Sequence, residues 1–206
     1  MKFVTYIDNS EERVGIIIGE NVIHINEIFN VLGKASVSSM TELIEKFEPT
    51  TIEKIETAIS NNNFNSESLS SVKLLAPIPN PKRNIFCLGK NYVEHAKEIK
   101  MTKISDTGIP DYPIYFTKVA SPAIGDGDSI KFSNVVTTQV DYEVELAVVI
   151  GKEGTDIKTE EAEEYIFGYT IVNDVSARDL QGKHIQWFKG KSLDTFCPMG
   201  PYLVRS

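Results

Sequence analysis

Three carboxylates recur at alternate positions in a segment that is otherwise typical of a β-strand, residues 140–151. In an extended chain alternate residues share a face, so Asp141, Glu143 and Glu145 are expected to point the same way. Beyond Glu145 the segment is apolar on both faces, which is typical of a strand that enters a core. Carboxylates at the point where the strand becomes apolar must be solvated, paired with a base or bound to a cation, because an unpaired buried charge is very costly.

A second strand-like segment, residues 167–172, leads to another acid, Asp174. Glu143, Glu145 and Asp174 would supply three oxygen ligands from two strands, which suits Mg²⁺ or Mn²⁺ better than zinc. The ordinary alternative for a Glu-x-Glu pair is a solvated acidic strand face. Metal binding is favoured here because no base alternates with the acids and the strand turns apolar at once.

The chain resembles the fumarylacetoacetate hydrolase family in five segments that keep the family's order and spacing. These segments are residues 84–98, 115–118, 141–152, 168–181 and 190–201. The resemblance implies that Glu143, Glu145 and Asp174 bind Mg²⁺ or Mn²⁺. Five weak matches in one order make a chance resemblance improbable.

The same resemblance assigns further site residues. His95 and Glu98 correspond to the family's water-activating pair, and their i,i+3 spacing places them on one face of a short helix. Lys191 corresponds to the active-site lysine, while Arg178 and Gln181 correspond to substrate-orienting residues. Without the resemblance, His-x-x-Glu would be a surface pair, Lys191 a solvated lysine, and the last two residues an ordinary first turn of a helix.

The function implied is that of a metal-dependent enzyme acting on a small 2-oxo acid through an enolate, which the metal stabilises as a Lewis acid. Oxaloacetate decarboxylation and acylpyruvate hydrolysis are the leading reactions, and the same enolate also serves tautomerisation. The alternative within enzymes is an isomerase of 2-hydroxyhepta-2,4-diene-1,7-dioate or 5-carboxymethyl-2-hydroxymuconate. The alternative from another class is a non-catalytic binding protein derived from the family. Family members are typically dimers, so the resemblance also implies a homodimer.

An α+β fold with two parts should position these residues. A small N-terminal α+β module, residues 1–75, and a mixed, mostly-β roll core, residues 76–206, are predicted on either side of a proline-rich connector. Because the family's core normally continues further, its C-terminal part is expected to be missing. Strands are predicted at 3–7, 14–18, 22–25, 84–88, 114–116, 142–150, 167–172 and 202–204; helices at 40–47, 51–60 and 91–100; and a loop at 61–71.

Composition narrows the class of protein. The 206 residues are 41% apolar and 24% charged, as in an average globular protein, with a net charge of −8. This acidic balance argues against nucleic-acid binding. No segment has the apolar length of a membrane span or the pattern of a signal peptide. Cys87 and Cys197 show no CxxC spacing and are predicted to be free thiols, which fits the reducing cytoplasm.

Overall fold

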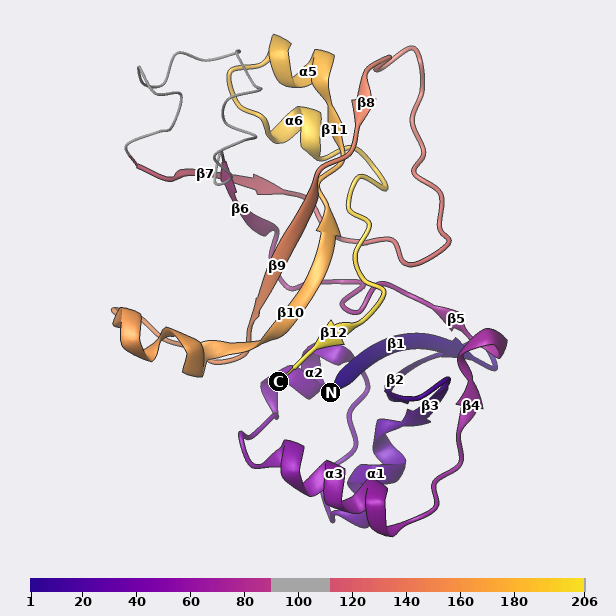
Figure 1. The fold of residues 1–206 in the computed structure, drawn as a ribbon. Coiled ribbons are helices and arrows are strands. Elements are labelled where there is room, and N and C mark those ends of the chain that lie inside the picture. Colours follow the sequence, from indigo (N-terminus) through magenta and orange to yellow (C-terminus); the bar gives the residue numbers. More distant parts are fainter. Residues whose placement is uncertain (90–111, 206) are drawn as a thin grey trace.

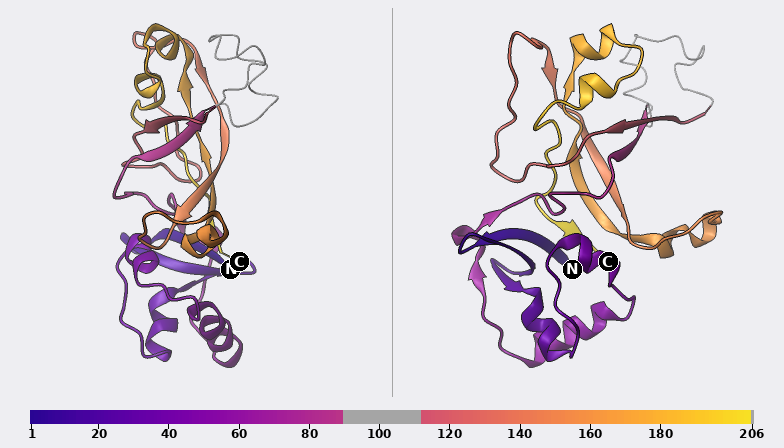
Figure 2. Two further views of the ribbon diagram at one scale, coloured as in Figure 1. Left: turned by 90° about the vertical axis from the view of Figure 1, so that its left-hand side faces the viewer. Right: turned by 180° about the vertical axis from the view of Figure 1, so that it is seen from behind.

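The computed structural model describes residues 1–89 and 112–205. It has the expected α+β architecture, in which an N-terminal module with three helices adjoins a mostly-β core (Figure 1). The two ends of the described chain lie side by side in every view (Figure 1, Figure 2). The Met1 amino group donates to the Arg205 carbonyl at 2.6 Å, and the Arg205 amide donates back to the Met1 carbonyl at 3.0 Å.

The N-terminal module contains strands, helices and a 3₁₀ turn. In chain order they are β1 (Lys2–Asp8), β2 (Glu11–Ile18), β3 (Asn21–His24), α1 (Ile25–Val31), α2 (Met40–Glu45), α3 (Thr51–Asn61), β4 (Glu67–Ser68), η1 (Leu69–Ser71) and β5 (Lys73–Leu74). The β1–β2 hairpin turns through Asn9 and Ser10, with φ angles of 48° and 68°. Two left-handed residues in a two-residue loop match the twist of the paired strands.

The core of this module lies between its sheet and its three helices. Fully buried members from both layers are Phe3, Ile16, Ile25, Ile28, Leu43 and Ile55. Helix α1 was not predicted, because the preceding apolar strand β3 leads into it without a side-chain cap to mark its start. Helices α2 and α3 confirm the predictions at 40–47 and 51–60, with ends that differ by one or two residues.

The remaining elements build the part that carries the predicted site. They are β6 (Ile85–Gly89), β7 (Ile114–Lys118), β8 (Val140–Asp141), β9 (Val144–Ile150), η2 (Thr159–Tyr165), β10 (Ile166–Asn173), β11 (Ser176–Ala177), α5 (Arg178–Lys183), α6 (Phe188–Lys191) and β12 (Leu203–Val204). Helices α5 and α6 lie near β11 at the end of the β9–β10 hairpin that is distant from the N-terminal module (Figure 1). The helix predicted at 91–100 lies outside the described residues.

One sheet connects the two parts of the chain. Its strand order is β4-β3-β2-β1-β12-β10-β9, with β5 also paired to β1. Strand β12 pairs with β1 through Phe3 and Leu203 and with β10 through Tyr169 and Val204, so it joins the N-terminal strands to the long hairpin. Two small sheets, β6–β7 and β8–β11, complete the pairing among described strands. The boundary near residue 75 stays a prediction.

The expectation that the strand after Glu145 enters a core on both faces is wrong. Residues 145, 147 and 149 of β9 are half-buried, whereas the alternate side chains are exposed. The exposed fractions are 64% for Val144, 62% for Leu146, 47% for Val148 and 62% for Ile150. Strand β9 is the last strand on its side of the described sheet, and only one of its faces packs against neighbouring residues. Among the helices described, none combines the length and the apolar character needed to cross a membrane.

Candidate functional site

The ends of β9 and β10 bring Glu143 and Asp174 next to each other. These strands are antiparallel, so the residue before β9 faces the residue after β10. The Asp174 amide donates to the Glu143 carbonyl at 2.7 Å, and the Glu143 amide donates to the side-chain oxygen of Asn173 at 3.0 Å. The carboxylates are largely withdrawn from solvent, with 11% of the Glu143 side chain and 5% of the Asp174 side chain exposed. Two acids predicted from different segments therefore share one place in the fold.

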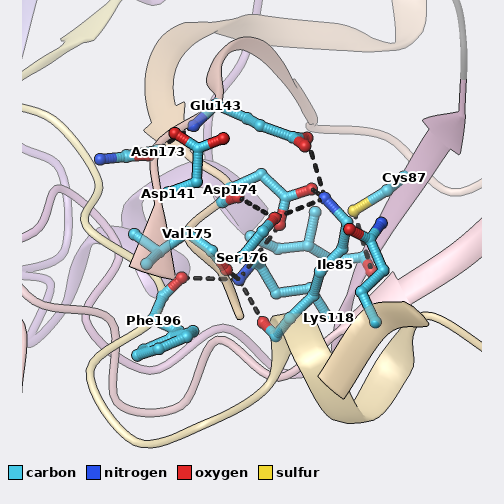
Figure 3. A network of polar contacts seen from close by, with 12 residues as sticks. Ile85, Cys87, Lys118, Asp141, Glu143, Asn173, Asp174, Val175, Ser176 and Phe196 are labelled. Atoms are coloured by element: carbon cyan, nitrogen blue, oxygen red, sulfur yellow. Dashed lines mark hydrogen bonds and ion pairs between the residues drawn. The ribbon is translucent and has the colours of Figure 1, made fainter. Parts of the chain in front are cut away.

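Lys191 joins these two carboxylates. It is the last residue of α6, and its side chain is 2% exposed. Its Nζ donates to Glu143 Oε2 at 2.8 Å, to Asp174 Oδ2 at 2.5 Å and to Ser176 Oγ at 3.0 Å. The three acceptor residues lie close together in Figure 3. The three hydrogens of the ammonium each have an acceptor, so the buried charge is both paired and hydrogen-bonded.

Arg178 forms the outer part of the same network. Its Nε and one terminal nitrogen donate to Asp141 Oδ2 at 3.0 Å and 2.8 Å. Its other terminal nitrogen donates to Glu143 Oε1 at 2.5 Å and to Gln181 Oε1 at 3.1 Å. Arg178 and Gln181 do lie in the first turn of a helix, α5. In this arrangement the guanidinium binds protein carboxylates, and its predicted contact with substrate stays a prediction.

The local charges control the protonation of Glu143. Burial alone would raise the pKa of this carboxyl, but the charges and hydrogen bonds of Lys191 and Arg178 hold its pKa below the ordinary 4.5. Burial also lowers the pKa of Arg178, but its contacts with Asp141 and Glu143 raise that pKa above its ordinary value. Glu143 and Arg178 are therefore held as an ion pair at neutral pH.

Aromatic and sulfur-containing side chains border this polar network. Lys191 Nζ lies 5.2 Å from the centre of the Phe116 ring, and Phe116 packs edge-to-face on Trp187 with centroids 5.3 Å apart. Burial raises the pKa of the Cys87 thiol to about 12 and that of Cys197 to about 11. Both thiols are free, as predicted, and both stay protonated at neutral pH, so neither is suited to act as a nucleophile.

The donor atoms partly fit the predicted metal site. Oxygens of Glu143 and Asp174 converge on Lys191 Nζ, and the buried Asp174 Oδ1 accepts no hydrogen bond from the described residues, although Lys118 Nζ lies 3.1 Å from it. Glu145 is half-buried on β9 and makes a contact of its own. Within the described ranges, no three His, Cys, Asp or Glu side chains are already gathered around one point. Two carboxylates thus suit a hard cation, and Glu145 as the third ligand stays a prediction.

Two predicted residues lie outside the described part of the chain, and two residues of the network were not predicted. His95 and Glu98 lie outside the described residues. Sequence reasoning assigned no role to Lys118 or Ser176, and it did not predict that Arg178 pairs with Asp141. The signal for Lys118 was a lysine at the end of a mostly apolar strand-like segment, residues 114–118. For Ser176 there was none, because a single serine carries no pattern.

Comparison with known proteins identifies the same family as the five segments of the sequence. A family model described as the C-terminal part of fumarylacetoacetate hydrolase matches residues 84–206. The oxaloacetate tautomerase YisK of Bacillus subtilis is 58% identical over 137 residues, which cover 66% of this chain and 44% of that protein. A mitochondrial oxaloacetate tautomerase of Xenopus laevis is 39% identical, over 96% of this chain and 59% of its own length. The chain therefore spans about half the length of these curated relatives.

Solved structures share the fold over almost the whole chain. A fumarylacetoacetate hydrolase from Exiguobacterium antarcticum matches with a TM-score of 0.78 and 36% identity, covering 99% of this chain and 66% of that one. A maleylpyruvate hydrolase from Sphingobium, in complex with manganese and pyruvate, matches with a TM-score of 0.73 and 26% identity, covering 100% and 67%. The predicted fold class is confirmed by these likenesses.

Proposed function

We propose that this chain, which belongs to the fumarylacetoacetate hydrolase family, interconverts the enol and keto forms of oxaloacetate. The observation that carries the proposal is the buried Lys191 ammonium between Glu143 and Asp174. Relatives named as oxaloacetate tautomerases support the choice of reaction, because they include a bacterial protein that is 58% identical over 137 residues. Sequence reasoning favoured decarboxylation or hydrolysis, which pass through the same enolate. Tautomerisation is simpler, because it needs only that the enolate forms and is protonated again.

Enol–keto conversion of oxaloacetate requires positive charge near the oxygen on C2 and a group that transfers a proton near C3. Tautomerisation moves a proton between C3 and the oxygen on C2, and no carbon–carbon bond breaks. Lys191 is suited to hold a proton at that oxygen, because its ammonium is buried and carries three donors. An incoming oxygen would replace one acceptor of Nζ, and the neutral Ser176 hydroxyl is the least costly to replace. We assign the proton transfer at C3 to His95, oriented by Glu98, on sequence grounds alone.

We further propose that Glu143, Glu145 and Asp174 hold Mg²⁺ or Mn²⁺. When bound, such an ion supplies Lewis-acid stabilisation for the negative charge that develops on the substrate. The oxygen-only donor set supports a hard cation, as does the manganese in the related maleylpyruvate hydrolase structure. A small 2-oxo acid and a second copy of the chain are the proposed partners, and light scattering will test the homodimer.

Hydrolysis of an acylpyruvate is the second candidate. It is favoured by the match to a solved maleylpyruvate hydrolase over 100% of this chain, at 26% identity. Hydrolysis differs from tautomerisation in needing an activated water and a pocket for the acyl group. The two reactions can therefore be separated by substrate.

The test is a substrate panel with Mn²⁺ or Mg²⁺ present. Enol oxaloacetate, an acylpyruvate and a hydroxymuconate are each incubated with the protein, and enol decay, pyruvate release and double-bond migration are followed separately. We expect faster enol decay without pyruvate release. Pyruvate release from oxaloacetate would indicate decarboxylation, and release from acylpyruvate alone would favour the hydrolase. Substrate binding with no turnover would support the non-catalytic alternative and contradict the proposal.

A further inference from the structure

Lys118 is a fully buried lysine to which the proposed reaction gives no role. It ends strand β7, and its exposed fraction is 0%. Its Nζ donates to the carbonyl of Phe196 at 2.6 Å, to that of Val175 at 3.3 Å, and to that of Lys191. The same atom lies 3.1 Å from Asp174 Oδ1 (Figure 3). Three carbonyl acceptors and one carboxylate oxygen therefore surround one ammonium.

Such an arrangement needs an explanation, because a buried ammonium is costly. An apolar side chain of similar size is often neutral or stabilising in place of a buried ion pair. These four oxygens compensate the burial of Lys118, but they do not explain why a charge stands there. Their location offers the explanation, because all four belong to segments that carry site residues.

These contacts hold both members of the central ion pair. Asp174 has one oxygen at Lys118 Nζ and the other at Lys191 Nζ, so a cation faces each end of its carboxylate. The backbone carbonyl of Lys191 also accepts from Lys118. One atom on β7 thus anchors the carboxylate that follows β10 and the end of α6 that presents the lysine. The aromatic contact between Lys191 and Phe116 ties the same helix end to β7 again.

We propose that Lys118 is a positioning residue that fixes Asp174 relative to Lys191. It acts through these two residues and makes no contact with substrate. The inference rests on the proposed function only in that it takes Asp174 as a cation ligand. A purely structural lysine would differ measurably: its loss would lower stability, while molecules that remain folded would keep the cation affinity of the wild type.

The first test measures Mn²⁺ affinity by calorimetry on Lys118→Met, at a temperature where circular dichroism shows every variant folded. Loss of a group that orients a ligand typically weakens metal binding by about 10–100-fold. We expect a decrease in that range, with no change in the matched control Lys189→Met, which removes an exposed lysine from the same helix as Lys191. Wild-type affinity in folded Lys118→Met would overturn the proposal.

Two further measurements keep the proposal testable. If Lys118→Met does not fold, Lys118→Gln replaces it, since an amide retains two donors but no charge. If the wild type itself binds no Mn²⁺, the metal proposal fails, and the positioning role is decided without metal. In that case the ¹⁵N signal of the Lys191 ammonium, assigned by its loss in Lys191→Met, should shift in the Lys118 variant. An unchanged signal would contradict the positioning role.

Discussion

The Lys191 ammonium and the Asp174 carboxylate form an ion pair that is almost wholly buried, with Nζ 2.5 Å from Oδ2. Each partner has a second opposite charge beside it, Glu143 next to Lys191 and Lys118 next to Asp174. A buried pair of this kind becomes unfavourable when one partner is lost, because the other is left without compensation. The relationship therefore links the stability of the fold to the chemistry of the site.

Removing the lysine of this pair should destabilise the protein. We expect Lys191→Met to lower the free energy of unfolding by about 3–5 kcal/mol, since it leaves two carboxylates short of a cation. Adding Asp174→Asn should restore part of that loss, because the pair is then removed as a unit. Urea denaturation measures both, with Lys189→Met as the exposed control, expected within about 0.5 kcal/mol of the wild type. Strictly additive changes would show that the two residues are not coupled.

Metal binding should depend on all three predicted ligands. Mn²⁺ raises the melting temperature if it binds only the folded protein. We expect Glu143→Gln, Glu145→Gln and Asp174→Asn each to reduce this rise strongly, and Glu160→Gln, on the exposed η2, to leave it unchanged. Thermal melts with and without Mn²⁺ provide the measurement. A full rise in Glu145→Gln would remove that residue from the ligand set.

Acid should weaken the fold through Glu143. Its pKa is lowered in the folded protein, so the unfolded chain binds more protons and stability rises with pH in that range. The contribution is fully present above the ordinary pKa of 4.5 and is lost as the pH falls through the lower folded value. Urea midpoints measured from neutral pH to about pH 3 should therefore fall more steeply for the wild type than for Glu143→Gln. Parallel curves would mean that other carboxyls account for the acid sensitivity.

The contacts of Arg178 lead to a kinetic prediction. Because its nitrogens bind Asp141 and Glu143, Arg178→Lys should disturb the position of Glu143 and lower kcat, with little change in KM. A direct contact with the substrate's distal carboxylate would instead raise KM. Steady-state kinetics on oxaloacetate separates the two. A rise in KM alone would restore the substrate-orienting role that the sequence suggested.

Local patterns predicted strands β9 and β10, which position Glu143 and Asp174, but not the short elements β8, β11, α5 and α6, which carry other site residues. Alternating or continuous apolar residues marked β9 and β10, and the acids at their ends marked Glu143 and Asp174. These signals are local, because the pattern of apolar residues within a segment is enough to indicate a strand. The register that places the two acids face to face is a property of the pair of strands, and only the structure supplies it.

Long-range packing explains what sequence reasoning missed. Strand β12 pairs with β1 across almost the whole chain, and nothing in residues 203 and 204 specifies that partner. A lysine is normally exposed, so the burial of Lys118 follows only from the convergence of three distant segments around its Nζ. Helix α1 is short and uncapped by any side chain, and its apolar residues continue those of β3.

The most direct test of the account is the rate at which enol oxaloacetate becomes the keto form in the presence of Mn²⁺. The wild type should accelerate this conversion, and Lys191→Met should reduce kcat by about 10²–10⁴, the usual contribution of a positioned proton donor. Lys189→Met should retain the wild-type rate. Folded Lys191→Met with undiminished tautomerase activity would contradict the central claim that the Lys191 ammonium, between Glu143 and Asp174, is the group on which the reaction depends.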